Sequence, residues 1–200
     1  MNHTVEQYIK GLREAYYNNG GKEEWEHFEK IKHGLTSEDI KKLTMVYPDI
    51  PEALISMLEY VDGTYWREYA GEEITFYFLG SAVEEYPYYL LSTKEIIDNQ
   101  HKASEYYSEY IERRYAEVEI DEKITNQVAN LTWLHFSDCM NNGGTSKLYI
   151  DFSPSEKGKK GQIVRYLHDP DEIKVIADSF EDYLKMLIEN EYDFIQEDFL

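Results

Sequence analysis

Two short segments near the C-terminus alternate between apolar and polar residues, and this pattern constrains the fold more than any other feature. In residues 147–152, Leu148, Ile150 and Phe152 share one side of an extended chain, and residues 162–167 alternate in the same way. Such a period of two is typical of half-buried strands. The sequence between them, SPSEKGKKG, contains a proline and two glycines. We therefore predict that the two segments form a β-hairpin.

Helical spacing of apolar residues appears on both sides of this hairpin. After it, Phe180 begins an apolar stripe at i, i+3, i+4 and i+7 that can lie against a sheet. At the N-terminus, a capping box at residues 4–7 predicts a first helix that ends at residues 18–21. A second helix is expected to end near Gly34. Together they would form an N-terminal helical arm, residues 1–34, packed on the main body or on another chain.

The middle of the chain carries further start and stop signals. Residues 36–39 and 92–95 each open a helix, and the second of these is predicted to run through residues 96–118. Pro51 suits the first position of a helix that ends before Gly63. Residues 74–79, 90–91 and 133–136 have strand character.

The order of these elements lacks a regular alternation of strand and helix. It predicts an α+β fold, with a largely antiparallel, mixed sheet covered by helices. We expect a main domain at residues 35–188, followed by an acidic C-terminal tail at 189–200 that is either frayed or docked. Trp133, Ile150 and Phe180 should meet in one interior.

The formal net charge of −20 narrows the classes of partner. A chain this acidic argues against nucleic-acid binding, which needs basic residues to neutralise phosphates. It favours rapid capture of a basic protein, although solubility alone would explain the charge. No run of about 18 apolar residues predicts a membrane span, and no signal peptide is visible. A single cysteine suits a reducing compartment, so we expect a cytoplasmic protein.

Candidate sites for chemistry are few, and each has a simpler structural explanation. Residues 168–172 (HDPDE) could supply metal ligands or form an ordinary turn. His135 could act as a base or pack within a strand. Cys139 and His135 could form a nucleophile pair, but on an extended chain their side chains would lie about 13 Å apart, too far for a direct hydrogen bond. Asp151 could form an ion pair with the basic loop at 157–160 or face water. Gly143-Gly144 is expected to form a tight turn rather than a phosphate cradle.

No nucleotide-binding, zinc-protease or CxxC motif occurs in the sequence. We therefore expect no catalytic residue, no metal and no cofactor. A hydrolase with paired carboxylates remains a less favoured hypothesis, because forty acidic residues allow many pairs and the sequence selects none of them.

Three groups of residues, in this order, resemble a known family. They are PEA…YVDG at 51–63, WLHF at 133–136 followed by Gly143-Gly144, and YIDF…GQIV…SFEDYL at 149–184. Together they resemble the SUKH superfamily, in the Smi/Knr cell-wall-assembly-regulator-like branch, over about residues 34–188. Asp62-Gly63 stands where that family usually has Asn-Gly, the segment at 96–118 is longer than usual, and the N-terminal arm lies outside the match.

The resemblance implies an α+β domain whose bacterial members are mostly immunity proteins. Such proteins bind and neutralise a cognate polymorphic toxin, often a nuclease, without catalysis or cofactor. The alternative function is that of an intracellular interaction hub in cell-wall or signalling regulation, as in the fungal members.

Two acidic, aromatic stretches are the candidate surfaces for a protein partner. Carboxylates around a tyrosine or tryptophan would steer and anchor a basic toxin. The alternative is that these residues merely cover the core. The candidate residues are Tyr65, Trp66, Glu68, Tyr69, Glu72 and Glu73 in the first stretch, and Glu84, Glu85, Tyr86, Tyr88 and Tyr89 in the second.

Overall fold

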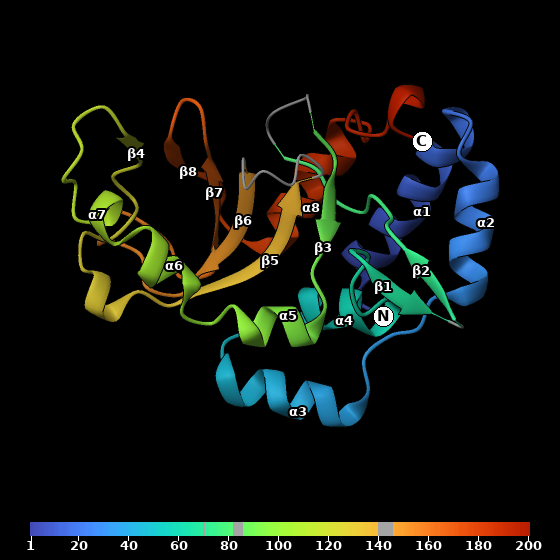
Figure 1. Cartoon of the computed structure of the whole chain (residues 1–200), viewed down its shortest axis with the longest axis horizontal. Helices are drawn as coiled ribbons and strands as arrows, with labels where there is room; N and C mark the ends of the chain where they lie inside the picture. The colour runs from blue at the N-terminus through green and yellow to red at the C-terminus, as the bar shows by residue number, and fades with distance from the viewer. Residues whose placement is uncertain (70, 82–85, 140–145) are drawn as a thin grey trace.

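The computed structural model describes residues 1–69, 71–81, 86–139 and 146–200, with the backbone only at 67, 69, 73 and 74 (Figure 1). The helices in these ranges are α1 (His3–Asn18), α2 (Lys22–Ile31), α3 (Ser37–Val46), α4 (Glu52–Tyr60), α5 (Thr93–Asp98), α6 (Lys102–Tyr106), α7 (Ser108–Ile111) and α8 (Phe180–Glu189). The strands are β1 (Arg67–Tyr69), β2 (Glu72–Ile74), β3 (Tyr88–Leu90), β4 (Glu119–Ile120), β5 (Trp133–Cys139), β6 (Ser146–Asp151), β7 (Gln162–Leu167) and β8 (Glu172–Ala177).

A mixed, largely antiparallel sheet with the strand order β3-β5-β6-β7-β8-β4 forms the centre of the molecule. Among the strands that the structure describes, only β4 pairs in parallel, with β8. The hairpin predicted from the alternating segments is confirmed as β6–β7, in which Ile150 lies opposite Ile163. A small second sheet joins β1 to β2. The architecture is therefore α+β, as the order of the elements predicts.

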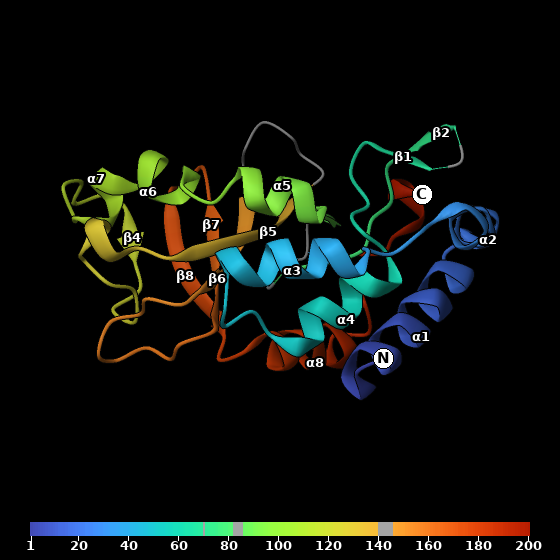
Figure 2. The same ribbon diagram turned by 90° about the horizontal axis from the view of Figure 1, so that it is seen from below.

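Helices cover both faces of the main sheet, and each face has its own core. Figure 2 shows α4 and α8 on one side of the sheet and α6 and α7 on the other. Ile150 and Phe180 lie in the first core, with α1, α4 and α8. Trp133 lies in the second core, with Ile111 and Val164. The expectation of one interior is thus wrong for Trp133. Successive residues of a strand point to opposite faces of the sheet, and in this protein both faces are buried.

The N-terminal helices and the C-terminal tail pack onto the first core. The Tyr8 hydroxyl of α1 donates to the Phe78 carbonyl at 2.6 Å, and the Tyr192 hydroxyl of the tail donates to the Tyr8 carbonyl at 3.0 Å. Phe194 in the tail is fully buried. The tail is therefore docked. The predicted cap at residues 4–7 is wrong, because the Asn2 side chain accepts from the backbone of Thr4 instead.

Two predicted elements differ from the structure. The long helix at 96–118 is replaced by α5, α6 and α7, because the chain must curve so that Tyr107 and Ile111 reach the second core. Arg113, with φ of 57°, ends this curve by donating to carbonyls of the following loop. The predicted strand at 74–79 has ladder pairing only at Ile74, in β2, and a single bridge from Leu79 to Tyr88. Its alternation reflects burial of Phe76 and Phe78 under α1 and α2.

In the part of the chain that the structure describes, no helix has both the length and the apolar character needed to cross a membrane.

Candidate functional site

A turn at Asp62–Thr64 sets the position of the β1–β2 hairpin against the main sheet. Thr64 is fully buried, and its N–H donates to the Leu90 carbonyl of β3 at 2.8 Å. Its carbonyl accepts from Phe76 N–H at 2.8 Å, so Thr64 joins the start and the end of the hairpin segment. Gly63 has φ of 90° and lies so close to Ser92 that a Cβ would be 2.7 Å from its backbone nitrogen. The hairpin therefore projects from a rigid base.

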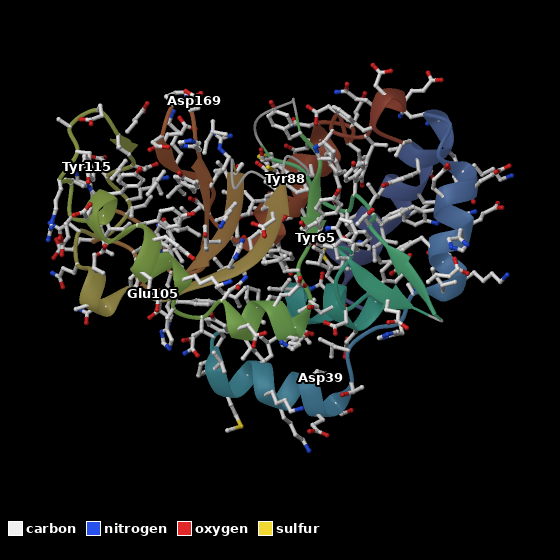
Figure 3. All side chains as sticks on the ribbon, viewed as in Figure 1. Asp39, Tyr65, Tyr88, Glu105, Tyr115 and Asp169 are labelled. Atoms are coloured by element: carbon white, nitrogen blue, oxygen red, sulfur yellow. The ribbon has the colours of Figure 1, made fainter. Side chains whose placement is uncertain are left out.

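Four aromatic rings form a continuous row beside this base, and we call it the aromatic ledge: Trp66, Tyr65, Tyr89 and Tyr77. The ring centroids of Tyr65 and Tyr89 are 4.7 Å apart, and those of Tyr77 and Tyr89 are 5.2 Å apart. Trp66 contacts Tyr65 edge to face at 6.1 Å. Figure 3 shows Tyr65 between the hairpin and β3. The two sequence stretches predicted as separate surfaces thus meet in one place.

One end of the ledge is buried and the other end is exposed to solvent. Tyr89 is buried, and burial together with a hydrogen bond to Tyr77 raises the pKa of its hydroxyl, which therefore stays neutral. At the other end, Trp66 is 61% exposed and its backbone has φ of 47°. A bulky residue in the left-handed region is strained, and such strain concentrates at functional sites. An exposed indole supported by tyrosine rings can anchor a protein partner.

Carboxylates lie in the β1–β2 hairpin that follows Trp66 in the chain. Glu68 of β1 is exposed, and so is Glu72 of β2. The Glu72 carboxylate pairs with His27 Nε2 at 2.8 Å, which joins the hairpin to α2. In the whole chain, acidic residues outnumber Lys and Arg two to one, and such an excess of negative charge favours the approach of cations.

The remaining predicted residues take different places. Tyr88 is buried, and its hydroxyl hydrogen-bonds the Ser146 hydroxyl at 2.5 Å, so we leave it out of the ledge. Tyr86 is partly buried against the first core. Tyr69 and Glu73 are described by their backbone alone, and Glu84, Glu85 and the predicted Gly143-Gly144 turn lie outside the described residues. Tyr77 was not among the predicted residues, although its position between the inward-facing Phe76 and Phe78 indicates a ring on the opposite side of the segment.

A β-bulge in β5 decides the environment of His135. His135 lies opposite Tyr149 and Ser137 lies opposite Leu148, so Phe136 is an extra residue between them. The bulge brings His135 and Asp138 to the same face, where His135 Nε2 and Asp138 Oδ1 are 2.9 Å apart. The other ring nitrogen, Nδ1, is 3.0 Å from Asn99 Nδ2, and the ring stacks on Tyr149. His135 is thus a packed, hydrogen-bonded histidine, whereas Cys139 is buried in the first core.

Replacing Asp138 with asparagine is expected to lower the free energy of unfolding by about 1–2 kcal/mol at neutral pH, because a charge-assisted hydrogen bond is lost. Burial alone would raise the pKa of the Asp138 carboxyl, but His135, Lys147 and Lys102 outweigh burial and lower it. A carboxyl with a lowered folded-state pKa stabilises the fold above its unfolded pKa, and that contribution is lost as the pH falls through the folded value.

The difference between wild type and Asp138→Asn should therefore narrow below about pH 4. Urea unfolding at a series of pH values measures it. A difference that is the same at pH 7 and pH 3 would contradict the assigned interaction.

Asp151 is buried, so the expectation that it faces water or forms an ion pair with the basic loop is wrong. Its carboxylate accepts from Ser153 N–H at 2.8 Å and from Gln162 Nε2 at 2.9 Å. Burial raises the pKa of this carboxyl, and those hydrogen bonds oppose the rise. The lysines of the basic loop pair instead with Asp49, Glu122 and Asp178. Asp151 therefore holds the ends of the β6–β7 hairpin together.

Residues 168–171 of the HDPDE segment form the turn between β7 and β8, and Glu172 begins β8, as the turn interpretation predicts. Within it, Asp171 accepts from the hydroxyl of Tyr110 at 2.6 Å and hydrogen-bonds His168. Over the described residues, no three His, Cys, Asp or Glu side chains are grouped as a metal ion would require.

Comparison with known proteins agrees with this architecture. Residues 34–186, which are more than half of the chain, match the SMI1 / KNR4 family (SUKH-1). The match begins at the glycine that precedes α3 and includes β5–β8 and most of α8. No curated protein matches the chain. From the extent of the family match, we conclude that the chain belongs to the SMI1 / KNR4 family (SUKH-1).

Proposed function

We propose that this chain is an immunity protein that neutralises a cognate polymorphic toxin by binding it non-covalently. Membership of the SUKH-1 family supports this proposal, since the bacterial proteins that the sequence resembles are mostly of this kind. The partner would be a basic toxin domain, in keeping with the charge of −20. The protein would act stoichiometrically in the cytoplasm, without catalysis or cofactor.

One observation carries the assignment of the binding surface: Trp66 is largely exposed, strained at its backbone and supported by the rings of Tyr65, Tyr89 and Tyr77. A tryptophan that is 61% exposed contributes little to the fold through burial, whereas the same residue at the centre of an interface contributes strongly to affinity. Glu68 and Glu72 at the rim would accelerate encounter with a basic surface. The toxin would thus be steered by charge and held by aromatic contact.

Toxin domains encoded beside the gene for this chain provide the test. Each is co-expressed with the full-length protein in a sensitive strain, and binding is measured on purified pairs by calorimetry. We expect protection by wild type and one-to-one binding. Trp66→Ala should weaken binding about 100-fold, because removal of a central aromatic anchor costs about 2 kcal/mol or more. Double substitution of Glu68 and Glu72 by glutamine should slow association and reduce its salt dependence.

Met45→Ala is the matched control, because Met45 is exposed on α3, away from the ledge, and should leave binding unchanged. Absence of binding and of protection for every neighbouring toxin would overturn the immunity function and favour the alternative, an interaction hub with housekeeping partners. Protection that is unaffected by Trp66→Ala would overturn the assigned surface.

A further inference from the structure

A cavity lies at the end of the molecule that carries α6, α7 and β4, the elements that Figure 1 shows together there. We call it the tyrosine cleft. Its volume is about 600 Å³, and it is lined chiefly by Tyr106, Tyr110, Tyr115, Glu117, Asp169 and Asp171. These residues come from α6–α7, from the loop before β4 and from the β7–β8 turn. In Figure 3, Tyr115 and Asp169 mark two of these segments.

Tyrosine rings provide the apolar walls of the cleft. Tyr110 and Tyr115 stand almost perpendicular, with centroids 5.5 Å apart and an angle of 79° between their planes. Tyr106 is 68% exposed and Tyr115 is 40% exposed, so both present ring surface to solvent. A cation already approaches one of these rings, because Lys147 Nζ lies 5.9 Å from the centroid of Tyr106. Exposed ring faces of this kind attract cations.

The hydroxyl groups of two rings are held by carboxylates. Tyr110 donates to Asp171 Oδ2 at 2.6 Å, and Tyr115 donates to Glu109 Oε2 at 2.6 Å. The hydrogen bond to Asp171, followed by burial, raises the pKa of Tyr110 to about 12. These tyrosines therefore stay neutral at physiological pH and keep their rings in fixed orientations. The walls of the cleft are preorganised.

Two further carboxylates add negative charge at the rim. Glu117 interacts electrostatically with the Tyr115 hydroxyl, and Asp169 interacts with His168. Among the residues that the structure describes, neither carboxylate has a hydrogen bond or an ion pair within 4 Å. The cations at the cleft are already paired: Arg114 pairs with Glu109 and Glu112, and His168 pairs with Asp171. The cleft thus combines aromatic walls with an excess of negative charge.

We propose that the tyrosine cleft binds an arginine side chain of a basic protein partner. Its guanidinium group would stack on the tyrosine rings and donate to the carboxylates of Glu117 and Asp169. Arginine fits better than lysine, because its planar, weakly hydrated head both stacks on rings and donates several hydrogen bonds at once. The inference rests on the proposed function for the basic character of the partner, whereas the chemistry of the cleft is independent of it.

The test uses the full-length protein labelled in its tyrosine rings and observed by NMR. It is titrated with a short capped peptide that contains one arginine, and with matched peptides that contain lysine or citrulline. We expect the ring signals of Tyr110 and Tyr115 to shift with the arginine peptide, with a dissociation constant of about 1–10 mM. The lysine peptide should bind several-fold more weakly, and the uncharged citrulline peptide should produce no saturable shift.

Two variants locate the site without disturbing the core. Tyr115→Ala, and the double substitution Glu117→Gln with Asp169→Asn, should each weaken arginine-peptide binding at least tenfold. Met45→Ala, at an exposed residue of α3, should leave it unchanged. Absence of shifts at 10 mM peptide, equal binding of the citrulline or lysine peptide, or unchanged binding by both cleft variants would overturn the proposal.

The peptide titration requires no toxin, so its failure is distinguishable from failure of the proposed function. A toxin that binds wild type normally while the arginine peptide does not bind would refute the cleft alone. The reverse result would refute the immunity function and leave the cleft as a guanidinium site for another basic protein.

Discussion

Gly34→Ala is expected to lower the free energy of unfolding by about 3 kcal/mol, at the upper end of the usual cost of forcing one methyl group into a packed site. A Cβ at Gly34 would lie 1.8 Å from the carbonyl oxygen of Glu59 and 2.4 Å from its carbonyl carbon. The clash is with the backbone of α4, so no side-chain rotation relieves it. The segment is also fixed on both sides, because Asp62 N–H donates to His33 O and Leu35 N–H donates to Leu58 O, each at 3.0 Å.

Gly20→Ala is the matched control for this substitution. Gly20 has φ of 89°, and a Cβ there would meet no atom within 4 Å. Its replacement costs only the backbone strain of a left-handed conformation, about 1–2 kcal/mol. Guanidinium unfolding of both variants against wild type measures the difference. Equal destabilisation by the two substitutions would contradict the close approach of residue 34 to α4.

Phe76→Ala is expected to destabilise the whole chain by about 4 kcal/mol, the cost of emptying a buried aromatic site. The Phe76 ring is stacked between Phe28 of α2, with centroids 4.1 Å apart, and Tyr16 of α1, with centroids 4.5 Å apart. Trp25 contacts it edge to face at 5.7 Å. Removal of Phe76 therefore releases both N-terminal helices from the segment that follows the β1–β2 hairpin.

Phe76→Ala should also leave unfolding as a single cooperative transition. Because α1 also packs on α8 and the C-terminal tail, loss of the Phe76 ring should lower the midpoint of one common unfolding transition. Tryptophan fluorescence and far-UV circular dichroism should report the same midpoint. Tyr106→Ala, at an exposed aromatic residue, should change stability by less than about 0.5 kcal/mol. Separate transitions, with the N-terminal helices melting first and the remainder unmoved, would contradict the single first core.

Local patterns predicted the elements whose signals are contained within a few residues. The capping box predicted at Ser92 is present, with a reciprocal hydrogen bond to Glu95, and the helix start predicted at residues 36–39 is a capping box between Thr36 and Asp39. The β6–β7 hairpin follows from alternation and turn residues. The helix 96–118 failed as a prediction for the converse reason: its apolar residues fit a long helix equally well, and only the curvature of the second core required three short ones.

The candidate surface was predictable in part. The sequence identified Trp66 and Tyr89 as aromatic residues in acidic surroundings, but it assigned them to separate stretches. Their union depends on Thr64, whose backbone links Leu90 to Phe76 across the chain. Tyr88 is buried beside Ser146 because β3 pairs with β5, and the local sequence pattern does not predict that pairing.

By itself, the sequence determined the α+β class, the hairpin, most helix positions and the acidic character that suits a basic partner, because propensity, capping and charge are properties of neighbouring residues or of composition. Tertiary structure alone decided that both faces of the sheet are covered, that the bulge at Phe136 brings His135 and Asp138 together, and that three distant segments enclose the tyrosine cleft. These features arise from contacts between residues far apart in the chain, and such contacts are settled by packing rather than by local preference.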